Sequence, residues 1–191
     1  MLEADSEAIV KFAMGHRSYE IDKFDELVLK SPNWACAIAA HIHLDHVLDV
    51  FLEDFCVRPK AVRSGAKRMS SLDKATLLYG VGVLSEGSFA SISNLNRLRN
   101  KFAHELNFDI SDAKVDEYRG NLMSAYGDRV RSRTEYFEAV GGRIEFKLML
   151  QLSVLFVEEE RLAHLIHGLR FAQSQADLAD AMLVARNTLL S

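Results

Sequence analysis

Cysteine and proline are scarce in this chain of 191 residues, which holds two of each. Cys36 and Cys56 lie within one predicted helix, where about 30 Å would separate them, so they cannot form a disulfide with each other. The absence of a CxxC pair argues against a thiolate zinc site. Such sparse use of cysteine favours a cytoplasmic protein, because thiols stay reduced in the cytoplasm.

Long apolar runs are also missing. A membrane-spanning helix needs about 18 or more consecutive apolar residues, whereas the richest stretch, residues 148–157, already contains Gln151 and Ser153. The N-terminal residues lack the basic and apolar regions of a secretory signal. We therefore expect a protein that neither crosses a membrane nor is exported.

Positive charge is not in excess, because 27 acidic residues outnumber 23 lysines and arginines and give a net charge of −4. The chain as a whole would not attract nucleic acid, so RNA binding has to come from a local basic patch. Residues 58–68 and 129–133 are candidate patches. The sequence shows no helix-turn-helix with a basic recognition helix, so direct sequence-specific DNA binding is not expected.

Strand signals are nearly absent, since no β-branched run alternates with polar residues and no Asn-Gly or Asp-Gly hairpin turn occurs. The hydrophobic fraction of 49% and the charged fraction of 26% are those of an ordinary globular domain. We predict an all-α fold, a single bundle of about seven to eight helices that spans residues 1–191.

Helical periodicity, capping residues and breakers give the boundaries of the expected helices. Charged loops are predicted over residues 58–69 and 127–133, and a break is predicted at Gly141-Gly142. The expected helices span residues 6–13, 19–29, 32–56, 72–84, 89–106, 113–126, 143–170 and 175–190.

Two of these helices have unusual compositions. Gly80 and Gly82 weaken the helix over 72–84, which suggests that another helix packs closely there. The stretch from Phe146 to Ile166 is apolar around much of its girth. Such a helix is expected to be buried on several sides, at the centre of the bundle or in a dimer interface.

The residues His41-Ile42-His43-Leu44-Asp45-His46 spell the HxHxDH motif of metallo-β-lactamase-type hydrolases. In mid-helix, however, about 100° per residue places His41 and Asp45 on one side while the other two histidines point elsewhere. We therefore expect neither a metal nor another cofactor. His41 and Asp45 fall beside an apolar helix face, where they either satisfy each other within the core or line a polar cleft shared with another helix.

A polar cluster at Arg99, Asn100 and His104 is the main candidate for chemistry. Arg99 lies close to an apolar stripe of its helix, where a permanently charged guanidinium needs an anion or a carboxylate partner. Asn100 and His104 are one turn apart and can be presented together. These groups suit holding a phosphodiester and moving its proton. The alternative is a structural arginine paired with Asp45 or a glutamate, with the histidine capping the helix end.

Neighbouring polar residues complete the expected site. Arg97 and Lys101 add positive charge with which RNA would be held. His41, Asp45 and Asn96 are expected to support the site, because polar intrusions on two apolar helix faces should meet when the helices pack. In that arrangement Asp45 would pair with Arg99.

The segment Arg99-Asn100-Lys101-Phe102-Ala103-His104 resembles the signature of HEPN domains, in which arginine, a following polar residue and histidine mark metal-independent endoribonucleases. The resemblance implies that Arg99 stabilises phosphate charge, Asn100 orients the phosphate and His104 transfers a proton when the ribose 2′-OH attacks phosphorus. It also implies a homodimer in which the two motifs face one cleft. If the chain is a toxin-type ribonuclease of this kind, we also expect an antitoxin-type protein partner.

The stretch from Leu72 to Ser85, continuing through Leu98-Arg99, is similar to the mannitol operon repressor family. The similarity extends from Trp34 to about Leu165 and is specific only in the central third. It implies an alternative function, a non-catalytic transcription-regulatory module that works through protein partners. Members of that family often lack the Asn100 and His104 pair, which places a purely repressor-like role in doubt.

Overall fold

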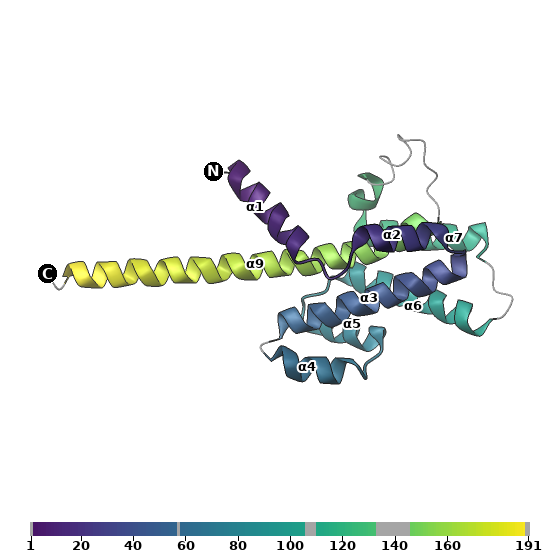
Figure 1. The fold of residues 1–191 in the computed structure, drawn as a ribbon, viewed down its shortest axis with the longest axis horizontal. Coiled ribbons are helices and arrows are strands. Elements are labelled where there is room, and N and C mark those ends of the chain that lie inside the picture. Colours follow the sequence, from purple (N-terminus) through teal and green to yellow (C-terminus); the bar gives the residue numbers. More distant parts are fainter. Residues whose placement is uncertain (1, 57, 106–109, 133–145, 190–191) are drawn as a thin grey trace. The chain divides into compact units, whose positions relative to one another are not determined.

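The structure, a computed structural model, describes residues 2–56, 58–105, 110–132 and 146–189, and over these ranges its regular secondary structure is α-helical with no strand. The all-α prediction is therefore confirmed. Residues 128–132 add a short helical stretch. The helices are α1 (Leu2–Gly15), α2 (Ile21–Lys30), α3 (Asn33–Phe55), α4 (Pro59–Ala66), α5 (Ser71–Gly80), α6 (Glu86–His104), α7 (Asp112–Tyr126) and α9 (Phe146–Leu189) (Figure 1).

The chain divides into two compact units, residues 18–160 and residues 1–17 with 161–191. In the second of these, the Phe12 ring stacks on the His16 ring at 3.9 Å, and the Arg161 guanidinium donates to the His16 carbonyl. The larger unit carries every residue of the candidate site.

Helix α3 is central to the larger unit, because it contacts α2, α4, α5 and α6. Figure 1 shows α2 and α3 side by side in this unit. The first turns of α9 supply a second part of the core, and Met149, Leu150 and Val154 are completely buried. The apolar side chains around the first turns of α9 are therefore buried inside the bundle, which is one of the two locations that the sequence predicted for them. The buried residues of α3 are Cys36, Ala37, Ala40, Leu44, Val47, Leu48, Phe51 and Leu52.

By length and composition, α3 could also cross a membrane, and among the described residues it is the one helix that is long and apolar enough to do so. Core helices meet the same criterion, and 44% of its most apolar window is buried inside the fold. The expectation that the chain does not cross a membrane stays a prediction. Cys36 and Cys56 are both free, in agreement with the prediction that they do not form a disulfide with each other.

Two predicted loops contain helix. Residues 59–66 form α4, which begins with Pro59 at the first helical position, where a fixed φ is favourable. Its Ala66 is only 3% exposed and Val62 packs against the core. Tertiary contacts therefore stabilise a helix in a segment whose basic composition had predicted a solvent-exposed loop. The charged turn at 127–133 likewise contains the helical residues 128–132, while residue 133 and the predicted break at Gly141-Gly142 lie outside the described ranges.

The glycine prediction on α5 is wrong. Helix α5 ends at Gly80, and Gly82 follows with a φ of +79°, a conformation that favours glycine. A Cβ at Gly80 or at Gly82 would meet no atom of the described residues within 4 Å, so none of the described helices packs closely there. The close approach occurs at Gly87 of α6, where a Cβ would lie 2.5 Å from the Ala125 carbonyl oxygen of α7.

The C-terminal helices predicted over 143–170 and 175–190 are one continuous helix, α9. The predicted interruption lies between residues 170 and 175, next to the polar run Gln173-Ser174-Gln175. That run contains neither glycine nor proline, so nothing in it breaks the backbone hydrogen-bond ladder.

Candidate functional site

Helix α6, which carries the candidate motif, is fixed firmly at its N-terminus. Ser85 caps the helix by accepting a hydrogen bond from the Ser88 amide at 3.2 Å. Glu160 accepts from the Ser85 amide at 2.7 Å and from the Ser88 hydroxyl. Ile92, Leu95 and Leu98 then bury one face of the helix. The C-terminal half of α6 is thereby held with its opposite face toward solvent.

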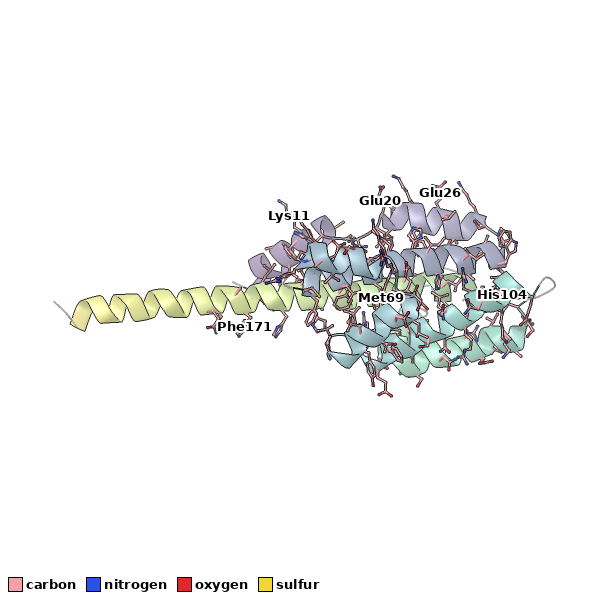
Figure 2. All side chains as sticks on the ribbon, turned by 90° about the horizontal axis from the view of Figure 1, so that it is seen from below. Lys11, Glu20, Glu26, Met69, His104 and Phe171 are labelled. Carbon is pink, nitrogen blue, oxygen red and sulfur yellow. The ribbon has the colours of Figure 1, made fainter. Side chains whose placement is uncertain are left out.

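The motif residues lie on the last turns of α6. His104 is the last residue of the helix and is exposed, and Figure 2 labels it at the margin of the larger unit. Arg99 and Asn100 are half-buried, and the Arg99 Nη1 donates to the Asn100 Oδ1 at 3.0 Å. Asn100 and His104 are one turn apart, so this bond connects Arg99 to a residue on the same side of the helix as His104.

Arg99 has no carboxylate within ion-pairing distance among the described residues, and Asn100 is its neutral partner there. The predicted pair between Asp45 and Arg99 is therefore wrong. The Asp45 carboxylate is 2.8 Å from the ammonium of Lys74 instead. A half-buried guanidinium without a carboxylate is suited to receiving an external anion.

The predicted association of His41, Asp45 and Asn96 is present. When His41 carries its proton on Nε2, it donates to the Asn96 Oδ1 at 3.2 Å and lies 3.3 Å from the Ser71 hydroxyl oxygen. The Ser71 hydroxyl in turn donates to the Asp45 Oδ1 at 2.6 Å. These bonds connect α3, α5 and α6, and they link His41 to Asp45 through Ser71, so the two side chains do not bond each other directly as one of the two alternatives predicted.

Lys74 and Ser71 belong to this network and were missed from the sequence. The Lys74 side chain is 2% exposed, and its ammonium also lies 2.8 Å from Asp49. Lys74 falls one residue before Ala75 and four before Leu78, both buried on α5. That helical spacing was the available signal, because it places the lysine on the buried face.

Burial lowers the pKa of His41 below its ordinary value, and the positive charges of Arg99 and Lys74 act in the same direction. The hydrogen bond to Asn96 and the charge of Asp45 oppose this shift. A neutral His41 therefore sits beside Arg99 at neutral pH and adds no competing positive charge.

The other histidines of the HxHxDH pattern have separate partners. His43 Nδ1 lies 2.9 Å from the carbonyl oxygen of Ala39, and His46 Nε2 lies 2.9 Å from that of Ser18. Within the described ranges, no group of three or more His, Cys, Asp or Glu side chains is arranged to hold a metal ion. The contacts agree with the helical-wheel argument that these side chains diverge.

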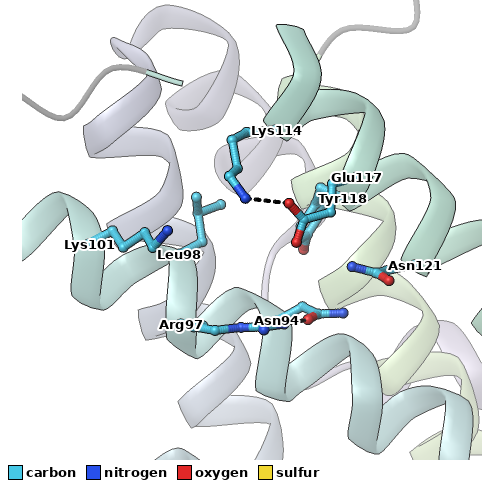
Figure 3. A pocket seen from close by; sticks show the side chains of 8 residues that line it. All are labelled: Asn94, Arg97, Leu98, Lys101, Lys114, Glu117, Tyr118 and Asn121. Carbon is cyan, nitrogen blue, oxygen red and sulfur yellow. Dashed lines mark hydrogen bonds and ion pairs between the residues drawn. The ribbon is translucent and has the colours of Figure 1, made fainter. Parts of the chain in front are cut away.

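Arg97 and Lys101 lie on the side of α6 that faces α7, where they line a pocket (Figure 3). The cavity has a volume of about 110 Å³. Arg97 is exposed and donates to the Asn94 Oδ1, while Lys114 of α7 is ion-paired with Glu117. The pocket is lined by Asn94, Arg97, Leu98, Lys101, Lys114, Glu117, Tyr118 and Asn121.

No family model, curated protein or solved structure matches this chain. The similarities to HEPN domains and to the mannitol operon repressor family therefore rest on the motif residues themselves. Functional reasoning proceeds from the geometry of α6 and its neighbours.

Proposed function

We propose that the chain is a metal-independent endoribonuclease of the HEPN kind, which holds RNA at the C-terminal half of α6. The observation that carries the proposal is the hydrogen bond from Arg99 to Asn100. It joins a guanidinium that has no carboxylate partner among the described residues to an amide that lies one helical turn from the exposed His104. A cation, an amide and an imidazole within two turns of one helix are the groups that binding and cleaving an RNA phosphodiester requires.

Each motif residue has a distinct role in this mechanism. The ribose 2′-oxygen attacks the adjacent phosphorus, and its proton passes to an imidazole of His104 that acts as general base. The phosphorus–5′-oxygen bond breaks, and the leaving oxygen takes a proton from a general acid. Arg99 stabilises the negative charge that builds on the phosphoryl oxygens, while Asn100 orients the group. The products are a 2′,3′-cyclic phosphate and a 5′-hydroxyl.

A homodimer completes the mechanism, because one imidazole cannot accept and donate a proton in the same step. A second copy related by a two-fold axis would supply the second His104. The exposed apolar side chains of α5 are far from His104 and so do not belong to this pairing surface. Tyr79 of α5 stacks on Phe89 near the start of α6, about 22 Å from His104 by helical rise. The proposed pairing therefore runs through the C-terminal end of α6.

Cleavage of single-stranded and structured RNAs in the presence of EDTA tests the proposal. His104→Ala should lower the rate about 100-fold or more, as loss of a general acid–base group does. Arg99→Ala should do the same, whereas His167→Ala, which removes an exposed histidine of α9, should retain the wild-type rate. Absence of cleavage, or equal cleavage by His104→Ala, would refute the proposal.

Mixed dimers test the shared site. If both histidines are needed, random pairing of equal amounts of wild-type and His104→Ala protein leaves about a quarter of the pairs fully active. Activity that falls only to half on mixing contradicts a shared site. A monomer near 21.5 kDa in sedimentation or light scattering contradicts it as well.

A second candidate function is the non-catalytic regulatory module, and one observation favours it. Leu77, Tyr79 and Val81 are 42–50% exposed and lie in the stretch that is similar to the mannitol operon repressor family. Exposed apolar side chains of this kind suit a protein partner. Leu77→Asp should then abolish capture of that partner while Leu27→Asp, at an equally exposed leucine of α2, does not. Equal capture by both variants would count against this function.

A further inference from the structure

The pocket between α6 and α7 concentrates positive charge in an acidic chain. Arg97, Lys101 and Lys114 line it, and Glu117 is the one carboxylate among its lining residues. The hydrogen bond and charge of Lys114 lower the pKa of Glu117, so this carboxylate is ionised at neutral pH. Three cations against one anion leave the pocket positive, although the chain carries a net charge of −4. This is the local patch that a polyanion requires.

The pocket also offers apolar and amide groups, which a site for a simple anion does not need. Leu98 and Tyr118 contribute apolar surface, and both are mostly buried. The Tyr118 hydroxyl is 2.7 Å from the Ser153 hydroxyl, which fixes the ring. Figure 3 shows the amides of Asn94 and Asn121 at one side of the same cavity. Apolar surface with nearby amides suits a nucleobase, whose faces are apolar and whose edges form hydrogen bonds.

The size of the cavity limits the ligand to one unit of a longer strand. Its volume of about 110 Å³ is several times what one water needs, roughly 10–15 Å³ on this measure. It is well below the roughly 300–1,000 Å³ of pockets that enclose a whole small ligand. A single base with its phosphate at the rim fits these limits better than an enclosed cofactor does.

The pocket lies next to the proposed cleavage site on α6. Arg97, Asn100, Lys101 and His104 follow one another at spacings of three, one and three residues, so they share one face of the helix. Lys101 and His104 are about 4.5 Å apart along the axis. A strand with one nucleotide in the pocket would therefore run toward Asn100 and His104.

We infer that the α6–α7 pocket binds one nucleotide of single-stranded RNA next to the phosphodiester that is cleaved. Its base packs against Leu98 and Tyr118, and its phosphate lies near Arg97, Lys101 and Lys114. This inference rests on the proposed endoribonuclease function, and it names single-stranded RNA as the substrate class. Recognition is by backbone charge and one base, which gives weak sequence preference.

A labelled 2′-O-methyl oligonucleotide of about ten nucleotides separates binding from cleavage, because it lacks the attacking hydroxyl. We expect Arg97→Ala and Lys114→Ala each to weaken binding several-fold in fluorescence anisotropy. Each should also reduce the slope of log K against log salt by about 0.7, the value for one phosphate contact on a single strand. Lys23→Ala is the matched control, since Lys23 forms the same i,i+3 pair with Glu20 on the surface of α2.

A variant with the opposite effect guards against misfolding. Glu117→Gln removes the only carboxylate that lines the pocket and should tighten binding, which a damaged protein would not do. An oligonucleotide with abasic sites should bind more weakly than the intact strand, and Asn121→Ala should reduce that difference.

The outcomes distinguish the two proposals. Wild-type-like binding by Lys114→Ala and Arg97→Ala overturns the inference that the pocket binds a nucleotide, even if the protein cleaves RNA. Equal binding of intact and abasic strands overturns the base site. Tighter binding of an acidic peptide than of RNA also overturns the inference. Loss of oligonucleotide binding in the pocket variants, without any cleavage by wild-type protein, supports the pocket and refutes the nuclease.

Discussion

Lys74→Met removes a buried ammonium group that holds two carboxylates on α3. The Lys74 side chain is 2% exposed, and its Nζ lies 2.8 Å from both Asp45 and Asp49. Methionine keeps the length of the aliphatic stem, so the substitution removes charge without opening a large cavity. The two aspartates are then left close together without a cation.

The expected loss of stability follows from the burial of the partners. Breaking a fully buried ion pair by removing one member costs about 3–5 kcal/mol. Asp45 and Asp49 retain 37% and 31% of their side-chain exposure, so water partly compensates them, and we expect about 2–3 kcal/mol. Asp45→Asn should cost only about 1 kcal/mol, because Asp49 still neutralises the lysine.

Urea unfolding followed by far-UV circular dichroism and tryptophan fluorescence measures these differences, provided that the two transitions coincide. The cycle formed by Lys74→Met, Asp45→Asn and the double variant should give a coupling energy of about 1–2 kcal/mol. Combining Lys74→Met with Asn at both aspartates should restore most of the loss. A Lys74→Met protein within about 0.5 kcal/mol of wild type would refute the buried ion cluster.

Two further predictions concern packing and pH. Gly87→Ala should destabilise the chain by about 1–3 kcal/mol, because its Cβ would lie 2.5 Å from the Ala125 carbonyl oxygen. Gly120→Ala, where a Cβ meets nothing within 4 Å, should instead stabilise the chain by about 0.5–1 kcal/mol. Equal melting temperatures of the two variants would contradict this contrast. Burial lowers the pKa of His41, so the unfolded chain binds more protons as pH falls from 6.5 toward the lowered pKa, and the free energy of unfolding decreases over that window. His41→Gln should reduce the difference in unfolding free energy between pH 7.5 and pH 5.5, and an unchanged difference would show that His41 is not the group responsible.

Much of the fold could be predicted from the sequence, because helical periodicity and breakers are local signals. The scarcity of strand signals and the helix from Pro32 onward were sufficient for the all-α assignment. Helical geometry alone also separated the histidines of the HxHxDH pattern, and their separate hydrogen bonds agree with it. The apolar girth of α9 predicted its burial for the same reason.

Tertiary contacts decided what those local signals leave open. The basic segment at 59–66 is a helix because Ala66 and Val62 reach the core, and no local rule predicts that contact. The sequence showed that Asp45 and Arg99 each needed a partner. The partner that each ion finds depends on how three helices pack together. In this packing Asp45 forms an ion pair with Lys74, and Arg99 donates a hydrogen bond to the neutral amide of Asn100.

The sequence by itself determined that this chain is helical and that arginine, asparagine and histidine occur within two turns of one helix. Only the tertiary structure decided that Arg97 and Lys101 meet Lys114 across a pocket, since the two helices are separated along the chain and come together through packing around Leu98 and Tyr118. The physical reason is that helical hydrogen bonds join residues close together in the sequence, whereas the pairing of charges depends on which buried faces of distant helices pack together.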